Sequence, residues 1–387
     1  MTGKKYTTYM DTSNLKIALV YDQVNKFGGA ERLLSALQKI YPQAPIYTLV
    51  HSPKSASWAS SFKVIPSPIN IFKPLRTRHQ WLSPIAPMMF ETFNLNKFDV
   101  VISITRDNAK AVITKPETLH ICYCLTPTRY LWGDIMEYNQ DIKMKLIPNS
   151  IKKYFRNTDL LISKRPDRYI AISKEVKDRI KTYYNQDSDV VYPPTEDKFY
   201  SKSKPNSPNK RKYYLVVSRL EPYKKTNLVI NTFNYLQGET LKVVGTGSQL
   251  KNLKKLAQGN TSFLGQVSDQ ELIKLYANAK AVIFPQIEDF GLVPLEAQAS
   301  GTPVIAFNKG GAKETVINNH TGILFNHQTV SSLTKAIKKF ESGKHQITPA
   351  KCQQNALKFT QDRFIINFRD KVNKLWQKHK LQLQQKQ

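Results

Sequence analysis

The chain has 387 residues, more than one hydrophobic core normally supports, so two domains of about 150–200 residues each are expected. Hydrophobic residues make up 41% of the sequence and aromatic residues 11%, which excludes an intrinsically disordered chain, and three cysteines without Cys-x-x-Cys spacing indicate neither a disulfide framework nor a zinc site. The net charge of +29 favours an anionic partner, either nucleic acid, lipid head groups or phosphorylated substrates, although a lysine-rich genome would raise the charge without any function.

The first half of the chain predicts an α/β domain over residues 15–192. Residues 1–14 lack the apolar core of a signal peptide and are expected to be a disordered extension, and no apolar run reaches the roughly 18–20 residues that span a bilayer. An apolar strand at 16–21 is followed by a glycine-containing turn and a helical pattern at 30–40. Strands interleaved with helices predict a doubly wound parallel sheet, and further strand patterns recur at 99–104, 119–125 and 168–172.

The second half predicts a second α/β domain over residues 213–360. Residues 193–212 are rich in Pro, Ser, Asn and Lys and indicate a linker. Residues 361–387 predict a helix to about Lys380, which would cross back onto the first domain, with a frayed tail from Gln377. The expected strands of the second domain are 213–218, 241–244, 262–264, 281–284, 303–307 and 322–325.

Residues 284–297 carry the strongest functional pattern. A strand ends there, a loop containing Gly291 follows, and a helix begins near Leu292, so backbone N–H groups at its positive end could bind phosphate. Glu288 lies in the loop and Glu296 a turn inside the helix, so one carboxylate could reach a sugar and the other a ribose. The same two residues could equally be a solvated loop residue and a surface helix residue.

Two other loops should meet this one. Arg219 and Lys224 follow a strand and precede a helix, where they could neutralise a diphosphate. Gly245 and Gly247 follow the next strand, although a Gly-x-Gly alone is as consistent with a simple tight turn. Loops at the carboxyl ends of parallel strands converge on one crevice, so these residues, together with Gly310, Gly311 and Glu314, predict a nucleoside diphosphate site.

These motifs resemble family 4 of the retaining glycosyltransferases. The family signature is an acidic residue, seven residues and a glutamate, preceded by an Arg-Leu-x-Pro-x-Lys segment, and Glu288/Glu296 and residues 219–224 match it in order and spacing. The resemblance extends over nearly the whole chain, because residues 22–50, with Gly28 and Gly29, resemble a bacterial subgroup described as mannosyltransferases.

The resemblance implies a GT-B fold, two Rossmann-like domains that face a central cleft, with the donor on the second domain and the acceptor on the first. It implies no metal ion and no cofactor besides the nucleotide-sugar donor. GDP-mannose is the first candidate for this donor, and a UDP-sugar is the second. By this carry-over, Glu288, Arg219 and Lys224 act in catalysis. The donor would be bound by Gly28, Gly29, Arg219, Lys224, Gly245, Gly247, Phe290, Gly291, Leu292 and Glu296.

The sequence departs from the subgroup at two positions. The resemblance leads us to expect a histidine before Thr126 and another in the segment after Ser103, but the chain has Leu125 and Arg106. Retaining transfer on the donor's front face could use the leaving phosphate as the proton acceptor, so activity does not require these histidines. Arg106 and Arg129 are interpreted as groups that stabilise charge or hold an anionic acceptor, or else as exposed charges.

The basic residues also favour a membrane surface. Residues 62–93 and 142–168 mix Lys and Arg with apolar residues such as Phe72, Leu82 and Phe90, which suits anionic lipid. We therefore expect a cytoplasmic protein, peripheral on the inner face of the cell membrane, that acts on a lipid-linked or glycan acceptor in envelope polysaccharide synthesis.

Three alternatives compete with this interpretation. A nucleic-acid-binding protein could use the same charges, but no helix-turn-helix, zinc-finger or RNP-like signature is visible, so no nucleic-acid partner is expected. A two-domain dehydrogenase would require Gly-x-Gly-x-x-Gly, which the Gly28-Gly29 segment lacks. A nucleotide-sugar-binding protein that lost catalysis together with the histidines stays open.

Overall fold

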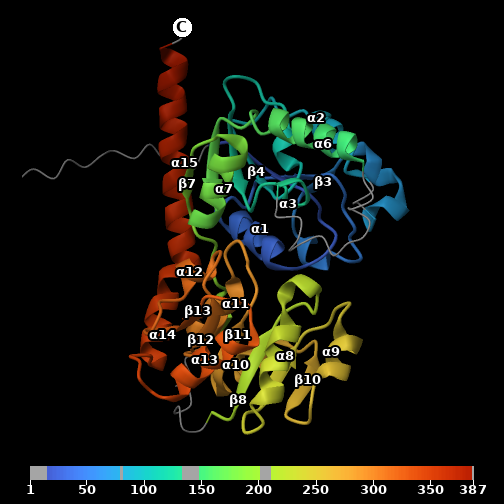
Figure 1. Cartoon of the computed structure of the whole chain (residues 1–387). Helices are drawn as coiled ribbons and strands as arrows, with labels where there is room; N and C mark the ends of the chain where they lie inside the picture. The colour runs from blue at the N-terminus through green and yellow to red at the C-terminus, as the bar shows by residue number, and fades with distance from the viewer. Residues whose placement is uncertain (1–14, 79–81, 133–147, 201–210, 386–387) are drawn as a thin grey trace, which may run out of the picture.

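The computed structural model describes residues 15–78, 82–132, 148–200 and 211–385. It consists of two α/β domains, one above the other in Figure 1, and the long C-terminal helix runs along the N-terminal domain. The predicted extension over residues 1–14 lies outside the described residues, as does half of the predicted linker, residues 201–210.

The N-terminal domain is built on a parallel sheet of seven strands in the order β3-β2-β1-β4-β5-β6-β7. The strand order reverses between β1 and β4, and ligands of doubly wound sheets bind at such switch points. Its strands are β1 (Ile17–Tyr21), β2 (Ile46–Thr48), β3 (Val64–Pro66), β4 (Val100–Thr105), β5 (Leu119–Cys124), β6 (Arg168–Ala171) and β7 (Ser188–Val190). Its helices are α1 (Gly29–Ile40), α2 (Ala86–Glu91), α3 (Arg129–Trp132), α6 (Asn149–Ile162) and α7 (Lys174–Tyr184), with 3-10 turns η2 (Ser57–Ala59), η3 (Pro68–Ile71), η4 (Lys73–Arg76) and η6 (Ala109–Ala111). The next 3-10 turn, η7 (Asp197–Phe199), packs in the core of the C-terminal domain.

The C-terminal domain has a parallel sheet of six strands in the order β10-β9-β8-β11-β12-β13, with its switch point between β8 and β11. Its strands are β8 (Tyr213–Val217), β9 (Leu241–Val244), β10 (Thr261–Gly265), β11 (Ala279–Phe284), β12 (Val304–Phe307) and β13 (Gly322–Phe325). Its helices are α8 (Thr226–Tyr235), α9 (Leu250–Leu256), α10 (Asp269–Asn278), α11 (Leu292–Ala299), α12 (Ala312–Thr315), α13 (Val330–Glu341), α14 (Pro349–Ala356) and α15 (Gln361–Gln384), with 3-10 turns η9 (Pro222–Lys224) and η10 (Leu357–Phe359).

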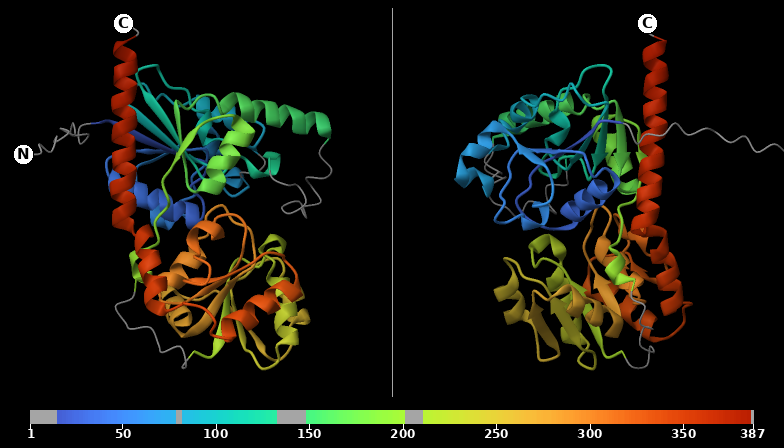
Figure 2. Two further views of the ribbon diagram at one scale, coloured as in Figure 1. Left: turned by 60° about the vertical axis from the view of Figure 1, so that its left-hand side comes forward. Right: turned by 180° about the vertical axis from the view of Figure 1, so that it is seen from behind.

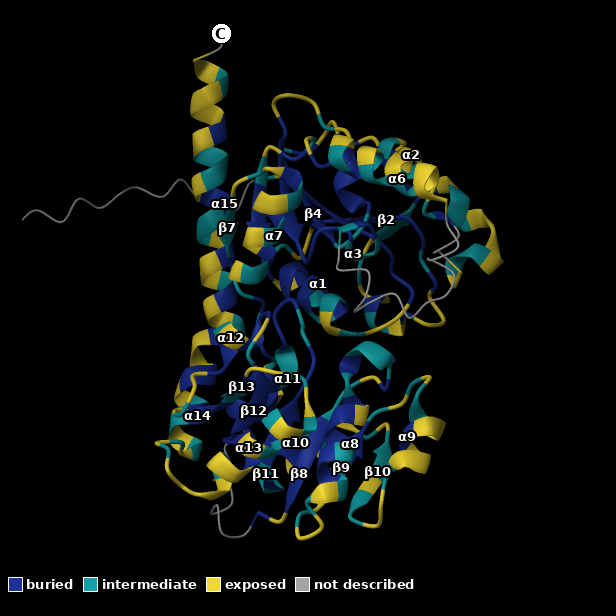
Figure 3. Ribbon diagram, viewed as in Figure 1, coloured by how far each residue is buried: buried dark blue, intermediate teal, exposed yellow. Residues whose placement is uncertain are grey.

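The predicted GT-B class of two doubly wound domains is confirmed. The central strands are buried on both faces, because helices cover each side of each sheet (Figure 3), and this burial explains their continuous apolar runs. Sequence reasoning missed β2, β3 and β7, which have three residues each and lie at or next to the sheet edges, where a short strand carries little periodic signal.

Helix α15 crosses back onto the N-terminal domain, as predicted (Figure 2). Phe364 and Phe368 pack against Tyr123 of β5, with ring centroids 6.3 and 5.1 Å from it. The prediction of a frayed tail from Gln377 was wrong, since the helix continues to Gln384. His379 shares a hydrogen bond of 3.1 Å with the Pro116 carbonyl, and this contact holds the end of the helix against the N-terminal domain.

The chain passes between the domains at two places that lie next to each other. One is the segment before η7 and the other is the junction of η10 and α15. The Thr195 N–H donates to the Phe359 carbonyl over 2.8 Å, and the Tyr200 hydroxyl donates to the Ala356 carbonyl, also over 2.8 Å. The two crossings are therefore hydrogen-bonded to each other. Within the described residues, no helix combines the length and apolar character that crossing a membrane would require.

We expect Phe368→Ala to destabilise the protein by about 3–5 kcal/mol, because Phe368 is fully buried between α15 and the N-terminal sheet and its truncation leaves a cavity. Denaturant unfolding would measure this. Ile366→Ala is the matched control, since Ile366 lies on the same helix and is 59% exposed. Equal stability of the Phe368 variant and the wild type would show that this contact contributes nothing to stability.

Candidate functional site

A cavity of about 1300 Å³ lies between the domains, at the carboxyl ends of the strands of both sheets. The N-terminal domain contributes the loop before α1 and the segments after β4 and β5, and the C-terminal domain contributes the loops after β8, β9 and β11. Loops at the switch points of both sheets therefore face the same space, where doubly wound proteins bind ligands.

The structure brings ten of the eleven predicted site residues to this cavity. They are Gly28, Gly29, Arg219, Lys224, Gly245, Glu288, Phe290, Gly291, Leu292 and Glu296. Gly247 does not line it. A Cβ at Gly247 would lie 2.5 Å from the Leu220 carbonyl oxygen, so this glycine permits the close approach of two loops and matches the simple-turn alternative.

Helix α11 begins at Leu292, as predicted, and points its N-terminus at the cavity. Gly291 precedes it with φ 87°, a left-handed conformation that favours glycine, and no described side chain caps the helix. Phe290, Gly291, Leu292 and Val293 all line the cavity. Backbone N–H groups without helical partners and the positive end of the helix dipole are thus placed where an anion can bind.

Lys224 and Glu288 form an ion pair across the cavity wall, between η9 and the loop after β11. Burial raises the pKa of the Glu288 carboxyl, but Lys224 and Arg129 lower it by more, so the net pKa lies below its ordinary value. Glu288 is therefore a carboxylate at neutral pH. Arg219 is exposed and donates to the Tyr223 hydroxyl, so its guanidinium can move toward a ligand at small cost.

Glu296 is engaged on both carboxylate oxygens. Arg32 of α1 donates to Oε1 over 2.8 Å, and the Tyr276 hydroxyl donates to Oε2 over 2.9 Å. Sequence reasoning expected Glu296 to bind ribose and assigned no role to Arg32. Since each carboxylate oxygen can accept two hydrogen bonds, these contacts leave Glu296 able to accept further donors. The Arg32–Glu296 pair also joins the two domains.

Asp289 makes the second ion pair between the domains, and sequence reasoning gave it no role. Arg129 of α3 and Arg179 of α7 both donate to its carboxylate, Arg179 over 2.6 Å. The Ser173 hydroxyl donates to the Asp289 carbonyl over 2.5 Å. Its two arginine partners lie more than 100 positions away in sequence. The position of Asp289 next to Glu288 was therefore the only local feature that could have suggested a role for it.

Glu314 and the glycine pair support the site without entering it. The Glu314 carboxylate accepts hydrogen bonds from the backbone N–H groups of Lys174 and Glu175 at the start of α7, over 2.9 and 3.1 Å. A Cβ at Gly311 would lie 2.3 Å from Phe290, so this glycine allows the loop after β11 to pack closely. The expectation that Glu314 helps to form the nucleotide site was wrong; it caps a helix of the opposite domain.

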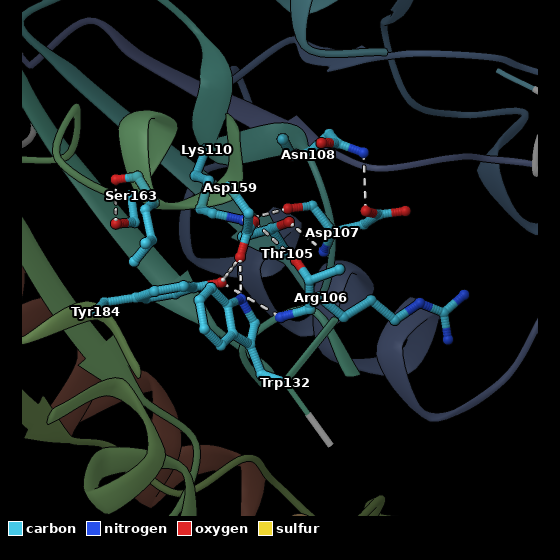
Figure 4. A network of polar contacts seen from close by, with 12 residues as sticks. Thr105, Arg106, Asp107, Asn108, Lys110, Trp132, Asp159, Ser163 and Tyr184 are labelled. Carbon is cyan, nitrogen blue, oxygen red and sulfur yellow. Dashed lines mark hydrogen bonds and ion pairs between the residues drawn. The ribbon is translucent and has the colours of Figure 1, made fainter. Parts of the chain in front are cut away.

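Arg106 and Leu125 line the cavity at the positions where histidines were expected. Asp107 lines it beside them, and its Oδ1 accepts from the Asn108 amide over 2.8 Å and from the Tyr130 hydroxyl over 3.0 Å. Figure 4 shows the Arg106 side chain extending away from the buried network behind it. The centre of that network is Asp159, whose carboxylate contacts Lys110, Thr128, Trp132 and Tyr184 over 2.5–2.9 Å.

The part of the chain that the structure describes contains no group of three or more His, Cys, Asp or Glu side chains suited to a metal ion. The side chains and backbone that line the cavity present cations, carboxylates and N–H groups.

We expect Asp107→Asn to stabilise the protein at pH 8 by about 1–2 kcal/mol, with little effect at pH 4. Burial raises the pKa of the Asp107 carboxyl to about 7, with a further contribution from Asp22, whereas Lys110 lowers it. Between pH 3.8, the ordinary pKa, and about pH 7, the carboxyl is protonated in the folded protein and ionised in the unfolded chain. The free energy of unfolding therefore falls as the pH rises through this range. Thermal unfolding at both pH values would measure this. A variant less stable than the wild type at pH 8 would mean that Lys110 stabilises the carboxylate by more than burial costs.

Residues 197–359 match the family described as glycosyl transferases group 1. The GDP-mannose-dependent α-(1-6)-phosphatidylinositol monomannoside mannosyltransferase of Mycobacterium tuberculosis is 34% identical over 138 residues, which cover 31% of this chain and 36% of the relative. The O-antigen chain mannosyltransferase RfbU of Salmonella typhimurium is 30% identical over 214 residues, 52% of this chain and 59% of the relative. The chain thus spans between about a third and three fifths of the length of these two curated relatives.

Solved structures are similar over nearly the whole chain. The lipopolysaccharide outer core galactosyltransferase WaaB in its apo form has a TM-score of 0.65 at 18% identity, covering 92% of this chain and 99% of that one. Anabaena HepE in complex with UDP-glucose has a TM-score of 0.67 at 20% identity, covering 93% and 100%. The C-terminal domain thus matches the glycosyl transferases of group 1 in sequence, in agreement with the resemblance to family 4, and the whole chain has the GT-B fold of these solved structures.

Proposed function

We propose that the chain is a retaining, metal-independent hexosyltransferase that uses a nucleoside diphosphate sugar as its donor. The observation that carries this proposal is the Lys224–Glu288 pair beside the open N-terminus of α11, at the meeting point of the two domains. A diphosphate needs cations and backbone N–H groups, and a sugar needs a carboxylate to accept its hydroxyls. All three lie in one cavity.

Donor binding would rearrange the ion pair. The diphosphate is a stronger partner for Lys224 than a single carboxylate, so Lys224 and Arg219 bind the phosphates and release Glu288 to contact the sugar. The N-terminus of α11 adds backbone donors, and Glu296 accepts from the ribose hydroxyls while Tyr276 keeps its orientation. The same cations stabilise the charge that grows on the leaving diphosphate in the transition state.

GDP-mannose is the first candidate for the donor, and a UDP-sugar is the second. The first choice is supported by the mannosyltransferase relatives, of which one is named as GDP-mannose-dependent, and the second by the HepE structure, which contains UDP-glucose. Gln266 and Val267, which follow β10, also line the cavity, and we infer that they contact the base.

Transfer proceeds on the front face of the donor. The acceptor hydroxyl attacks the anomeric carbon as the bond to the leaving phosphate breaks, and its proton passes to that phosphate oxygen. The cations Arg219 and Lys224 hold the phosphate in place for this proton transfer. Because the leaving group serves as the base, the replacement of two expected histidines by Arg106 and Leu125 is compatible with activity.

The experiment that tests the donor site is a calorimetric titration of the protein with GDP, UDP and ADP in the presence of EDTA. We expect one nucleotide to bind with a micromolar Kd, and we expect Arg219→Ala to weaken it at least about tenfold, since it removes charge-assisted hydrogen bonds. Lys338→Ala, an exposed lysine on α13 outside the cavity, is the control and should bind as the wild type does. Absence of binding by all three nucleotides would sink the proposal and favour a nucleic-acid ligand.

Turnover then separates an enzyme from a binding protein of the same fold. Release of the nucleoside diphosphate from its sugar donor, in the presence of a membrane extract as acceptor source, should fall at least about a hundredfold in Glu288→Gln. This variant keeps the shape of the side chain and gives Lys224 no competing carboxylate, so it should bind the nucleotide at least as tightly as the wild type does. Tight nucleotide binding without turnover by the wild type would support the impaired binding protein instead.

The acceptor is a lipid-linked or glycan molecule in envelope polysaccharide synthesis, met by this protein at the cytoplasmic face of the membrane. Helices α2 and α6 lie at the end of the N-terminal domain farthest from the C-terminal domain (Figure 1). Contact with anionic lipid is supported by Lys152 and Lys153 and by the exposed apolar residues of these helices, which are Met88, Ile151, Tyr154 and Leu161. Leu82 and Phe90 are buried in the core, so their predicted place on this surface was wrong, and Lys143 and Lys145 lie outside the described residues.

We expect binding to vesicles that contain anionic lipid to weaken steeply as salt rises from 50 to about 300 mM, because screening removes the attraction of surface lysines. Charge reversal by Lys152→Glu with Lys153→Glu should weaken binding at low salt, whereas the same reversal at Lys338 and Lys339 on α13 should change it much less. Vesicle co-sedimentation measures this. Equal binding to neutral vesicles would contradict a role for the basic residues.

A further inference from the structure

A second cavity of about 370 Å³ adjoins the first. Two loops form the wall between them: residues 222–225 around η9, and residues 287–289 after β11. Thr126, Arg129, Tyr223 and Asp289 line both cavities, so the spaces meet at these side chains. Of the residues that sequence reasoning assigned to the nucleotide site, Gly310 lines the second cavity, and Arg219, Lys224, Glu288 and Glu296 do not.

Neighbouring residues of the wall face different cavities. Lys224 lines the first cavity and Lys225 the second. Lys225 adopts φ 53°, a left-handed conformation that costs a non-glycine residue roughly 1–2 kcal/mol. Such a conformation at a cavity wall is typical of functional sites, where the surrounding structure compensates the strain. Here it turns two consecutive lysines toward two spaces.

The two cavities differ in charge. Arginine, lysine and acidic side chains balance in the first, with five cations and five carboxylates among its lining residues. The second has five cations against two carboxylates: Arg129, Arg179, Lys225, Lys309 and Lys313 against Glu175 and Asp289. The excess positive charge around the cleft is therefore concentrated in the second cavity, which favours an anionic occupant.

Three of these cations are available to a ligand. Arg129 and Arg179 are already paired with Asp289. By contrast, Lys225, Lys309 and Lys313 form no ion pair with any residue in the described ranges. Lys225 lies between η9 and α8, Lys309 in the loop after β12, and Lys313 in α12. Flexible ammonium groups that converge from separate elements can surround a phosphate or a carboxylate.

An aromatic surface faces these lysines from the N-terminal domain. Trp132 and Tyr183 are stacked with ring centroids 5.5 Å apart, and both line the second cavity. The Trp132 Nε1–H donates to Asp159 over 2.5 Å, which fixes the indole. Cavities that combine rigid aromatic walls with a few charged groups are typical binding sites for small organic ligands.

We propose that the second cavity binds an anionic group of the acceptor, a phosphate or a carboxylate, and that the acceptor is therefore an acidic or phosphate-linked sugar. This inference rests on the proposed transferase function. The anionic group of the acceptor lies among Lys225, Lys309 and Lys313. The sugar of the acceptor lies toward Arg129 and Asp289, which line both cavities. A hydroxyl of that sugar then points past Arg129 into the first cavity, where Glu288 and the donor sugar meet.

The test is a calorimetric titration of protein saturated with its best nucleotide, using mannose 6-phosphate, mannose and inorganic phosphate as probes. We expect mannose 6-phosphate to bind at least about tenfold more tightly than mannose or phosphate, because it combines the anion with the sugar. Lys309→Ala with Lys313→Ala should weaken it about fivefold or more and leave the Kd of the nucleotide unchanged. Lys338→Ala with Lys339→Ala removes the same charge outside both cavities and should have little effect.

Each other result overturns the inference. Unchanged affinity in the Lys309/Lys313 variant places the anion elsewhere, and equal weakening by the Lys338/Lys339 variant reduces the effect to overall charge. Inorganic phosphate that binds as tightly as mannose 6-phosphate would make the cavity a site for free phosphate and not for an acceptor. Loss of nucleotide binding in the Lys309/Lys313 variant would assign these lysines to the donor. If the wild-type protein binds no nucleotide, the result contradicts the proposed function itself and not only the assignment of the second cavity.

Discussion

The carboxylate of Asp289 is bound by two arginines of the opposite domain, and the site depends on this constraint. The loop that carries Asp289 belongs to the C-terminal domain, yet its position is fixed by α3 and α7 of the N-terminal domain. Glu288 on one side of Asp289 and the start of α11 on the other are thereby held in place together. Removal of one arginine would leave a buried charge only partly compensated, which is costly in a protein interior.

Most of the fold was predictable, because the strands of a doubly wound sheet are buried on both faces and their apolar runs are continuous. Strand ends and glycine-containing turns also placed Arg219, Lys224, Glu288 and the start of α11 near one crevice. Side-chain pairing was not predictable. Arg32 and Glu296 are separated by 264 positions, and no local pattern relates them. The role of Glu314 was misjudged for the same reason, since the helix that it caps lies in the other domain.

The net charge of +29 could not be assigned from composition alone. In the structure, part of it balances carboxylates inside the first cavity, and part extends over the second cavity and over α6. These are different physical uses of the same residue type. A paired lysine such as Lys224 can exchange one anionic partner for another, whereas an unpaired surface lysine acts through a field that salt screens. Salt dependence can therefore separate the two groups in binding experiments.

The two crossings of the chain between the domains lie side by side and are joined through Thr195 and Phe359. A rotation about these crossings would open the cleft around an axis at the edge where α12, α14 and α15 lie (Figure 1). In such a rotation, elements on the side of the domain away from this axis, such as α8 and the η9 loop before it, would move farther than α11 (Figure 1). A small rotation would thus carry Lys224 away from the N-terminal domain while Glu296 stays close to it. The cleft would therefore widen first at the residues that bind the diphosphate.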